Sequence, residues 1–278
     1  MNRKNEQKKV LFFDIDGTLV GFDGTMSDST KQALSLAKSN GHKIVLCTGR
    51  SRCQIYPWLL EIGFDGIIGG AGSYVEINGK EISETLIQSN DLQMLIHFFE
   101  SIHTTYMLQT KEHIVVNPVC FYEAQQIFRE NYGMTEDRIK KVFGEMLIDE
   151  NPSERTDVEK LNYYFSTANI TEVSKAIGSQ FCVTATSFEQ PENMSGEVSY
   201  AGIHKAYGMQ LLVEALGMEQ TDTIAFGDGP NDIEMLEYAS IGVAMGNGVR
   251  EAKAVANMVT DSIDHDGIYH AMVNLDLI

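Results

Sequence analysis

Short apolar runs that end abruptly in glycine and polar residues recur along the chain. The first run, Val10–Phe13, is followed by Asp14 and Asp16 on either side of one isoleucine, and then by glycine and threonine. Such a run is typical of a buried strand in a parallel sheet, whose ligands bind just beyond the carboxyl ends of the strands. An isolated pair of acids of this kind more often only solvates a turn, so the rest of the chain has to decide between the two interpretations.

Two later apolar runs end in the same way, and helical patterns lie between them. Polar residues follow both runs: Thr48, Gly49 and Arg50 after 43–47, and Asp228, Asn231 and Asp232 after 223–226. Helices are predicted at 27–39, 204–216, 232–239, 249–256 and from 267 onward, with further strands at 241–245 and 258–260. This alternation predicts an α/β fold with a doubly wound parallel, Rossmann-like sheet and helices on both of its faces.

The middle of the chain breaks this rhythm. Helical segments at 92–102 and 121–132 are interspersed there with alternating strands at 160–165 and 181–186, a grouping that predicts an α+β insertion with its own sheet. We therefore predict a catalytic core formed by residues 1–83 and 190–278, and a second, smaller α+β cap domain over residues 84–189.

Composition narrows the classes of partner. The 278 residues include 21 Lys and Arg against 39 Asp and Glu, a net charge of −18 that repels polyanions and argues against nucleic acid or an anionic membrane as partner. No apolar run reaches the ~20 residues of a membrane span, the N-terminal segment 1–9 has no signal-peptide core, and the four cysteines are scattered. A cytoplasmic location is expected. A phosphorylated ligand would need a metal ion and a few basic residues at one spot.

The three strand ends supply such a spot. Parallel strands bring Asp14 and Asp16, Thr48, and Asp228 with Asp232 to the same edge of the sheet, and Lys205 stands where the helix before the third strand begins. The set combines a potential nucleophile, metal ligands, a hydroxyl group and a cation.

Each of these residues also has an interpretation without chemistry. Asp228 and Asp232 could equally cap the helix that begins near Asn231, and Thr48 could cap the segment that follows it. Lys205 taken alone would be an exposed surface lysine. Arg50 could reach a substrate or pair with a surface acid, and the sequence favours neither.

The motifs together resemble a known family. The order Asp-Ile-Asp-Gly-Thr-Leu, Thr-Gly-Arg, a lysine before a helix, and Gly-Asp-Gly-Pro-Asn-Asp resembles the haloacid-dehalogenase (HAD) superfamily, and specifically its Cof-type phosphatases with an inserted α/β (type IIB) cap. The resemblance continues through Val243–Asn247, Val259 and Asp266 with Gly267, so it covers both core segments. It departs from the Cof pattern at Ala206, at Ala71–Ser73 and at Gly248, none of which is an implied catalytic group.

The resemblance implies a role for each motif residue. Asp14 would attack phosphorus and form an aspartyl-phosphate, and Asp16 would act as acid and then base. Mg²⁺ would be held by Asp14, Asp228 and the backbone carbonyl of Asp16. Phosphoryl oxygens would contact Thr48, Gly49, Lys205 and Asn231, while Asp232 would hold Lys205 or water on the metal.

The expected function is Mg²⁺-dependent hydrolysis of small phosphate monoesters, sugar phosphates being the expected class, by a monomer or weak homo-oligomer. Two alternatives stay open. A phosphotransferase would pass the same intermediate to a hydroxyl acceptor, and a non-catalytic sensor would only bind the phosphorylated metabolite. The presence of both Asp14 and Asp16 argues against the sensor, because a pure binder has no need of an acid/base carboxylate.

Overall fold

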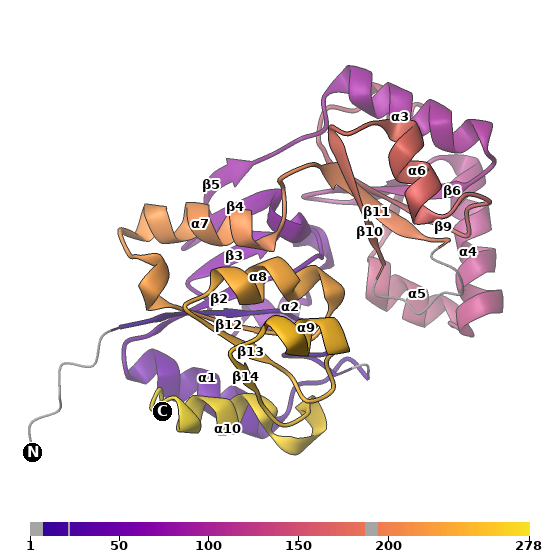
Figure 1. Cartoon of the computed structure of the whole chain (residues 1–278). Helices are drawn as coiled ribbons and strands as arrows, with labels where there is room; N and C mark the ends of the chain where they lie inside the picture. Colours follow the sequence, from indigo (N-terminus) through magenta and orange to yellow (C-terminus); the bar gives the residue numbers. More distant parts are fainter. Residues whose placement is uncertain (1–7, 22, 187–193) are drawn as a thin grey trace, which may run out of the picture. The chain divides into compact units, whose positions relative to one another are not determined.

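The computed structural model describes residues 8–21, 23–186 and 194–278, and its chain divides into two compact units. The larger unit takes in the residues up to Gly49, then Leu60–Ser83 and His204–Ile278, and the smaller unit takes in Arg50–Leu59 and Glu84–Ile203. Figure 1 follows the chain through both. Of the N-terminal segment 1–9, only the last two residues lie among those described.

The larger unit is built on an eight-stranded sheet in the order β14-β13-β12-β1-β2-β3-β4-β5. Its strands are β1 (Val10–Phe13), β2 (Lys43–Cys47), β3 (Gly66–Gly69), β4 (Tyr74–Ile77), β5 (Lys80–Glu84), β12 (Thr223–Gly227), β13 (Ile241–Ala244) and β14 (Met258–Val259). All pairs from β14 to β3 are parallel, whereas β4 runs antiparallel to β3. The doubly wound parallel core is therefore confirmed, with an antiparallel edge added to it.

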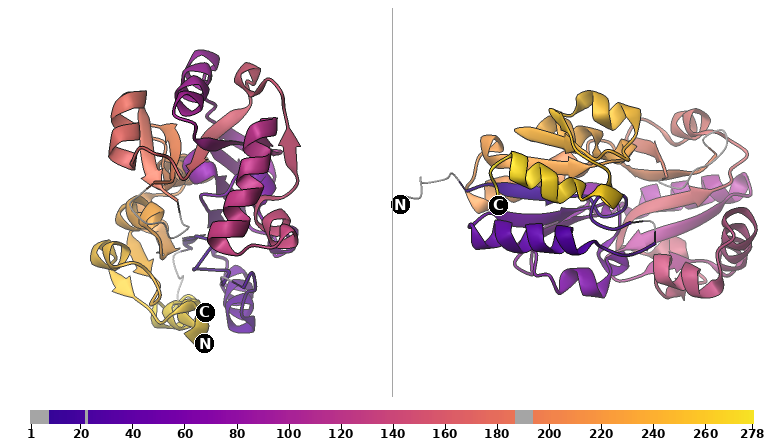
Figure 2. Two further views of the ribbon diagram at one scale, coloured as in Figure 1. Left: turned by 90° about the vertical axis from the view of Figure 1, so that its right-hand side faces the viewer. Right: turned by 90° about the horizontal axis from the view of Figure 1, so that it is seen from below.

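Helices cover both faces of this sheet (Figures 1 and 2). They are α1 (Asp28–Ser39), α7 (Lys205–Leu216), α8 (Ile233–Tyr238), α9 (Arg250–Val255) and α10 (Gly267–Asn274). Apolar side chains of α7 and α8 pack with Val10 and Phe12 of β1 in one buried cluster, and α1 and α10 lie side by side. Every position of β1 is buried, as expected for a central strand covered on both faces.

The smaller unit has its own six-stranded sheet in the order β10-β11-β9-β6-β7-β8. Its strands are β6 (Thr105–Thr110), β7 (Ile114–Val116), β8 (Met146–Ile148), β9 (Val158–Tyr164), β10 (Phe181–Ala185) and β11 (Gly196–Tyr200). Its helices are α3 (Ser89–Ser101), α4 (Pro118–Tyr132), α5 (Glu136–Phe143) and α6 (Ile170–Ile177), and α2 (Pro57–Leu60) lies where the two units meet in sequence. One large buried cluster joins α3, α4, β6 and β9.

The sheet pairing bears on the predicted end of the insertion. β11 pairs with β9 and β10, so residues 196–200 belong to the six-stranded sheet, although they lie beyond residue 189. The predicted boundary at 189 and 190 falls on residues outside those described, and the assignment of 84–189 as a cap domain stays a prediction.

None of the helices in the described part of the chain has the length and apolar character needed to cross a membrane.

Candidate active site

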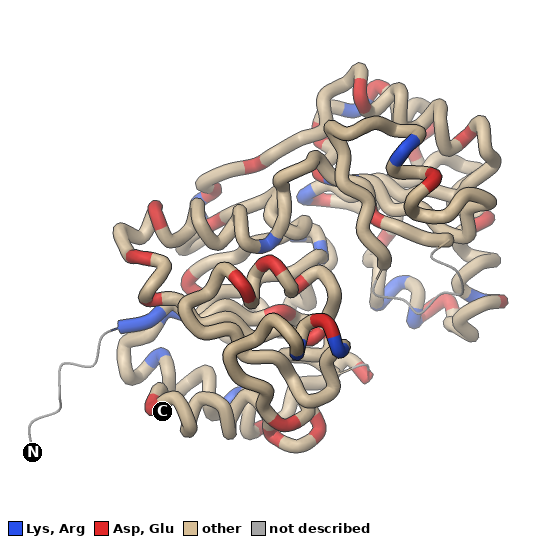
Figure 3. Tube along the Cα trace, viewed as in Figure 1, with Lys and Arg blue, Asp and Glu red and all other residues tan. Residues whose placement is uncertain are grey.

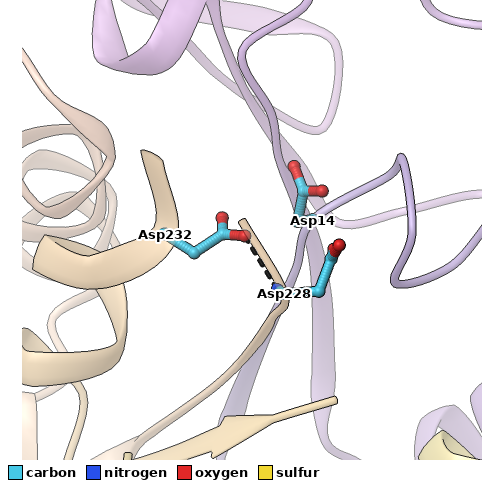
Figure 4. A group of neighbouring side chains, drawn as sticks. All are labelled: Asp14, Asp228 and Asp232. Carbon is cyan, nitrogen blue, oxygen red and sulfur yellow. Dashed lines mark hydrogen bonds between the residues drawn. The ribbon is translucent and has the colours of Figure 1, made fainter. Parts of the chain in front are cut away.

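The three predicted strand ends meet because their strands are in register. Phe13 at the end of β1 pairs with Leu46 of β2 on one side and with Phe226 of β12 on the other. The Asp14 N–H donates to the Phe226 carbonyl at 3.0 Å, which continues the ladder for one more residue. The residues that follow these strands therefore emerge at one edge of the sheet, and Figure 4 shows Asp14 beside Asp228 there.

Lys205 reaches the same edge from the first position of α7. Its side chain is 0% exposed, and its Nζ donates to Asp14 Oδ1 at 2.6 Å and to Asp232 Oδ1 at 2.5 Å. The His204 side chain caps α7 by accepting from the Tyr207 N–H at 3.2 Å, which fixes where the helix begins. The interpretation of Lys205 as a surface lysine is wrong, because the side chain is buried between two carboxylates.

Asp232 ties the turn after β12 to this lysine. Its Oδ2 accepts from the N–H groups of Asp228 and Gly229 at 2.9 and 2.8 Å, while its Oδ1 accepts from Lys205. Gly227 makes the tight turn possible, because a Cβ there would lie 2.6 Å from the Asp232 Cβ. Both oxygens of Asp232 are thus engaged with protein donors, and its side chain holds the turn and Lys205 together.

The loop after β1 holds Asp228 from the other side. Thr18 Oγ1 donates to Asp228 Oδ1 at 2.7 Å, and Thr18 is completely buried. Gly17 has a φ of +85°, and a Cβ at this position would lie 2.2 Å from Asp228 Oδ2, so only glycine allows this approach. Thr18 was not among the predicted site residues. Its place directly after the Asp-x-Asp-Gly run, in the same turn, was the available signal.

Carboxylates crowd this edge. Asp14, Asp228 and Asp232 each place one oxygen within 4.8 Å of the others. Burial raises the pKa of Asp14 well above its usual range; Lys205 opposes this, and the charges of Asp232, Asp228 and Asp16 add to it. Burial and the charge of Asp232 raise the pKa of Asp228 to about 7, although the Thr18 hydrogen bond lowers it. The site therefore holds more negative charge than its lysine offsets.

The lysine itself stays charged. Burial lowers the pKa of Lys205, but the charges of Asp14 and Asp232 outweigh it and raise the pKa above its ordinary value. A protonated lysine next to Asp14 leaves the other oxygen of that carboxylate available, and oxygen donors crowded in this way suit a hard divalent cation such as Mg²⁺.

The remaining predicted residues follow the same three strands, β1, β2 and β12. Thr48 is buried beyond β2, where its N–H donates to Ile68 and its carbonyl accepts from Ala71, and Gly49 follows it. Asp16 is half-buried after β1, and Asn231 is half-buried in the turn Pro230–Asp232.

Arg50 belongs to the smaller unit by its contacts. Its guanidinium lies 4.6 Å from the centre of the Tyr56 ring, and its Nη2 donates to the Tyr56 hydroxyl at 3.0 Å.

Comparison with known proteins places this site in a family. The sequence model of the haloacid dehalogenase-like hydrolases matches residues 11–272. The 5-amino-6-(5-phospho-D-ribitylamino)uracil phosphatase YitU of Bacillus subtilis (strain 168) is 26% identical over 93% of this chain and 94% of its own length. Among solved structures, the HAD subclass IIB sugar phosphatase BT4131 is 28% identical with a TM-score of 0.81, covering 98% of this chain and 100% of that one. The phosphatase BT1666 of Bacteroides thetaiotaomicron is 27% identical with a TM-score of 0.82, covering 100% of this chain and 98% of that one.

Because the family match extends over nearly the whole chain, the protein belongs to the haloacid dehalogenase-like hydrolases. Within that class it is a phosphatase, as YitU, BT4131 and BT1666 are.

Proposed function

We propose that the protein hydrolyses small phosphate monoesters, sugar phosphates being the expected class, with Mg²⁺ and through an aspartyl-phosphate on Asp14. The observation that carries this proposal is the position of Asp14. Its carboxylate ends the central strand, is held by the Nζ of a buried lysine at 2.6 Å, and shares one small volume with Asp228. A carboxylate fixed in this way is poised as a nucleophile, because its orientation is set before the substrate arrives.

The motif residues have different roles in the two steps of the reaction, formation and hydrolysis of the aspartyl-phosphate. In the first, an Asp14 oxygen forms a bond to phosphorus while the bond to the leaving oxygen breaks, and Asp16 donates a proton to the departing alkoxide. In the second, Asp16 takes a proton from water, whose oxygen attacks phosphorus and releases Asp14 and inorganic phosphate. We assign both tasks to Asp16 because it lies two residues beyond Asp14 on the same loop.

Phosphoryl oxygens carry negative charge in both steps and need donors. Lys205, Thr48, the Gly49 amide and Asn231 are the proposed donors, and Lys205 supplies a full positive charge. Asp232 supports this group indirectly, since its Oδ1 accepts from Lys205 at 2.5 Å.

The proposed metal ligands are Asp14, Asp228 and the backbone carbonyl of Asp16. Mg²⁺ at this position would offset the repulsion between the carboxylate nucleophile and the phosphate. The close approach of Asp14, Asp228 and Asp232 supports this assignment, because a cation relieves the excess negative charge that Lys205 leaves.

Two relatives support the substrate class. BT4131 is described as a sugar phosphatase, and YitU acts on a phosphorylated ribityl compound, so both names indicate small polyhydroxylated phosphate esters. The acidic composition of this chain, in which Asp and Glu outnumber Lys and Arg along the whole trace (Figure 3), also favours small esters over polyanions. The cytoplasmic location, the absence of nucleic acid and membrane partners, and the monomer or weak homo-oligomer stay predictions.

A panel of phosphate monoesters, assayed with Mg²⁺ or EDTA, tests the proposal. The native chain is expected to release phosphate only with Mg²⁺, and Asp14→Asn is expected to release none. Asp28→Asn, at a side chain 98% exposed on α1, is the matched control and should retain native rates. Phosphate release that persists in Asp14→Asn would refute the nucleophile.

Asp16→Asn tests a different role. It is expected to lose turnover while it still binds Mg²⁺, because only the backbone of this residue is proposed to touch the metal. Retained turnover would refute its acid/base role. A native chain that binds these esters with Mg²⁺ without hydrolysing any would refute the proposal as a whole.

A further inference from the structure

Thr18 differs from the other side chains that hold the acids of the active site. Among the three clustered carboxylates, Asp14 and Asp232 both accept from the positively charged Lys205, whereas the Asp228 Oδ1 accepts from the neutral hydroxyl of Thr18 at 2.7 Å. A neutral donor orients a carboxylate without offsetting its charge. Asp228 is therefore held in place by a contact that brings no positive charge to the site.

The loop that carries Thr18 also limits where the Asp228 carboxylate can lie. The Cα of Gly17 packs so closely against this carboxylate that a Cβ there would lie 2.2 Å from Oδ2. Thr18 thus fixes one oxygen while the backbone at Gly17 bounds the position of the other. The same loop bears Asp14 and Asp16, so the position of Asp228 is set relative to the residues with which it would share a cation.

A second loop, residues 247–249, holds both partners of the contact between Thr18 and Asp228. Asn247 Nδ2 donates to the Gly17 carbonyl at 2.8 Å, and its Oδ1 accepts from the Ile263 N–H at 2.9 Å. The Val249 N–H donates to the backbone carbonyl of Asp228 at 2.8 Å. The loop that holds Thr18 and the backbone of Asp228 are therefore both anchored. Only the side-chain torsions of Asp228 remain free, and the hydrogen bond from the Thr18 hydroxyl restricts them.

We infer that Thr18 is a positioning residue that orients Asp228 as a ligand and so sets the affinity of the site for divalent cations. The inference rests on the proposed Mg²⁺ site. It predicts that loss of the hydroxyl weakens metal binding, and that activity lost at low Mg²⁺ returns at saturating Mg²⁺. A structural role alone would lower stability and leave the metal affinity unchanged.

The test compares Thr18→Val, which removes the hydroxyl and keeps the shape, with Thr18→Ser, which keeps the hydroxyl. The readout is the Mg²⁺ concentration at which the thermal midpoint of the full chain has risen halfway. Thr18→Val is expected to need about tenfold more Mg²⁺, the effect of one hydrogen bond to a charged group, and Thr18→Ser should lie within about threefold of the native chain. Thr18→Ala serves with the same expectation where Thr18→Val is not recovered folded.

Thr260 provides a matched control in the same unit. Its buried hydroxyl donates to the Gly267 carbonyl, also at 2.7 Å, but it does not contact the acids. Thr260→Val should lower the thermal midpoint without changing the Mg²⁺ dependence. Native Mg²⁺ dependence in Thr18→Val, together with a lower thermal midpoint, would overturn the inference.

Phosphate release by the native chain separates the two proposals. If the native chain releases phosphate and Thr18→Val binds Mg²⁺ as the native chain does, only the inference fails. If the native chain releases none while Thr18→Val weakens Mg²⁺ binding, the inference holds and the proposed function fails.

Discussion

Two buried lysines of the chain have contrasting partners. Lys205 in the larger unit is 0% exposed and lies between Asp14 and Asp232, with Asp228 close by. Lys160 in the smaller unit has a side chain 1% exposed and pairs with Glu197 at 2.5 Å. The first lysine faces a surplus of carboxylates, whereas the second has one partner for one charge.

The smaller unit also contains a buried acid, Glu159, which is 2% exposed. Burial raises the pKa of Glu159 to about 7, even though the Ser51 hydrogen bond lowers it. Its Oε2 accepts from Ser51 at 2.9 Å, and its Oε1 has no hydrogen-bond partner among the described residues. An unpartnered oxygen in a buried place is less costly on a neutral carboxyl group than on a carboxylate.

The contrast teaches where excess charge is tolerated. Burial of ions is costly, and a fold reduces the cost by pairing them one to one or by protonating them. Both units raise the pKa of a buried acid to about 7, Glu159 in the smaller unit and Asp228 in the larger one, but only the smaller unit pairs its buried lysine one to one. The larger unit leaves several carboxylates to a single lysine, an arrangement that is favourable when a cation joins them, as the proposed function requires.

The largest effect should come from removing the lysine of the crowded site. Lys205→Met is expected to lower the free energy of unfolding in EDTA by about 3 to 5 kcal/mol, because it leaves buried carboxylates without their counter-charge. It should also lower phosphate release by about a thousandfold, since it removes the main positive charge near the phosphoryl group. Urea denaturation and the phosphate assay measure the two effects.

Lys160→Met is the matched control, since it removes a buried lysine from a single pair. Its cost is expected to be about 1 to 3 kcal/mol, because Glu197 has a side chain 19% exposed and can be solvated when it loses its partner. Mg²⁺ should restore part of the stability of Lys205→Met and none of that of Lys160→Met. Equal losses in the two variants, unaffected by Mg²⁺, would contradict the contrast between the sites.

The active site around Lys205 was largely predictable from the sequence, because the sequence signals for it are local. The apolar run Val10–Phe13 ends in two acids, and parallel pairing brings the ends of β1, β2 and β12 together without reference to distant side chains. Lys205 was identified by the motif order, since nothing in its neighbours indicates that it is buried. Thr18 was missed because its partner Asp228 is 210 positions away, and no periodicity encodes that contact.

The smaller unit was less predictable, because its local sequence patterns are short or weak and its contacts join distant residues. β7 (Ile114–Val116) and β8 (Met146–Ile148) have three residues each, too few to show alternation. β11 (Gly196–Tyr200) contains glycine, glutamate and serine, so its pattern does not stand out from a loop. The pairing of Ser51 with Glu159 joins residues 108 positions apart and depends on the fold of the whole unit.

The next largest effect on stability is expected at Glu159, the buried acid of the smaller unit. The pKa of Glu159 is raised in the folded chain from its ordinary 4.5 to about 7, so the folded state binds more protons than the unfolded state between these values. Its contribution to stability is therefore lost as the pH rises through this range. Glu159→Gln should be more stable than the native chain at pH ~8, by up to about 3 kcal/mol, and nearly equal to it at pH ~5.

Urea denaturation across this pH range measures the difference. Glu145→Gln, at a side chain 87% exposed in the same unit, is the control and should follow the native pH dependence. If Glu159→Gln follows the native curve at every pH, Glu159 is not kept neutral by burial, and protonation does not lower the cost of burying this acid.

The smallest effect concerns the hydroxyl that faces this acid. Ser51 is buried, and its single hydrogen lies between Glu159 Oε2 at 2.9 Å and Gln109 Oε1 at 3.1 Å. Ser51→Ala is expected to cost about 1 kcal/mol at pH ~6 and about 2 kcal/mol at pH ~8, because a hydrogen bond to an ionised carboxylate is the stronger one.

In the Glu159→Gln background the cost of Ser51→Ala should stay near 1 kcal/mol at both pH values, and this double-mutant cycle isolates the pair. Ser39→Ala, which removes an exposed hydroxyl that donates to the Ser35 carbonyl at 2.9 Å, is the control. A Ser51→Ala cost independent of pH would mean that this hydroxyl does not report the charge of Glu159.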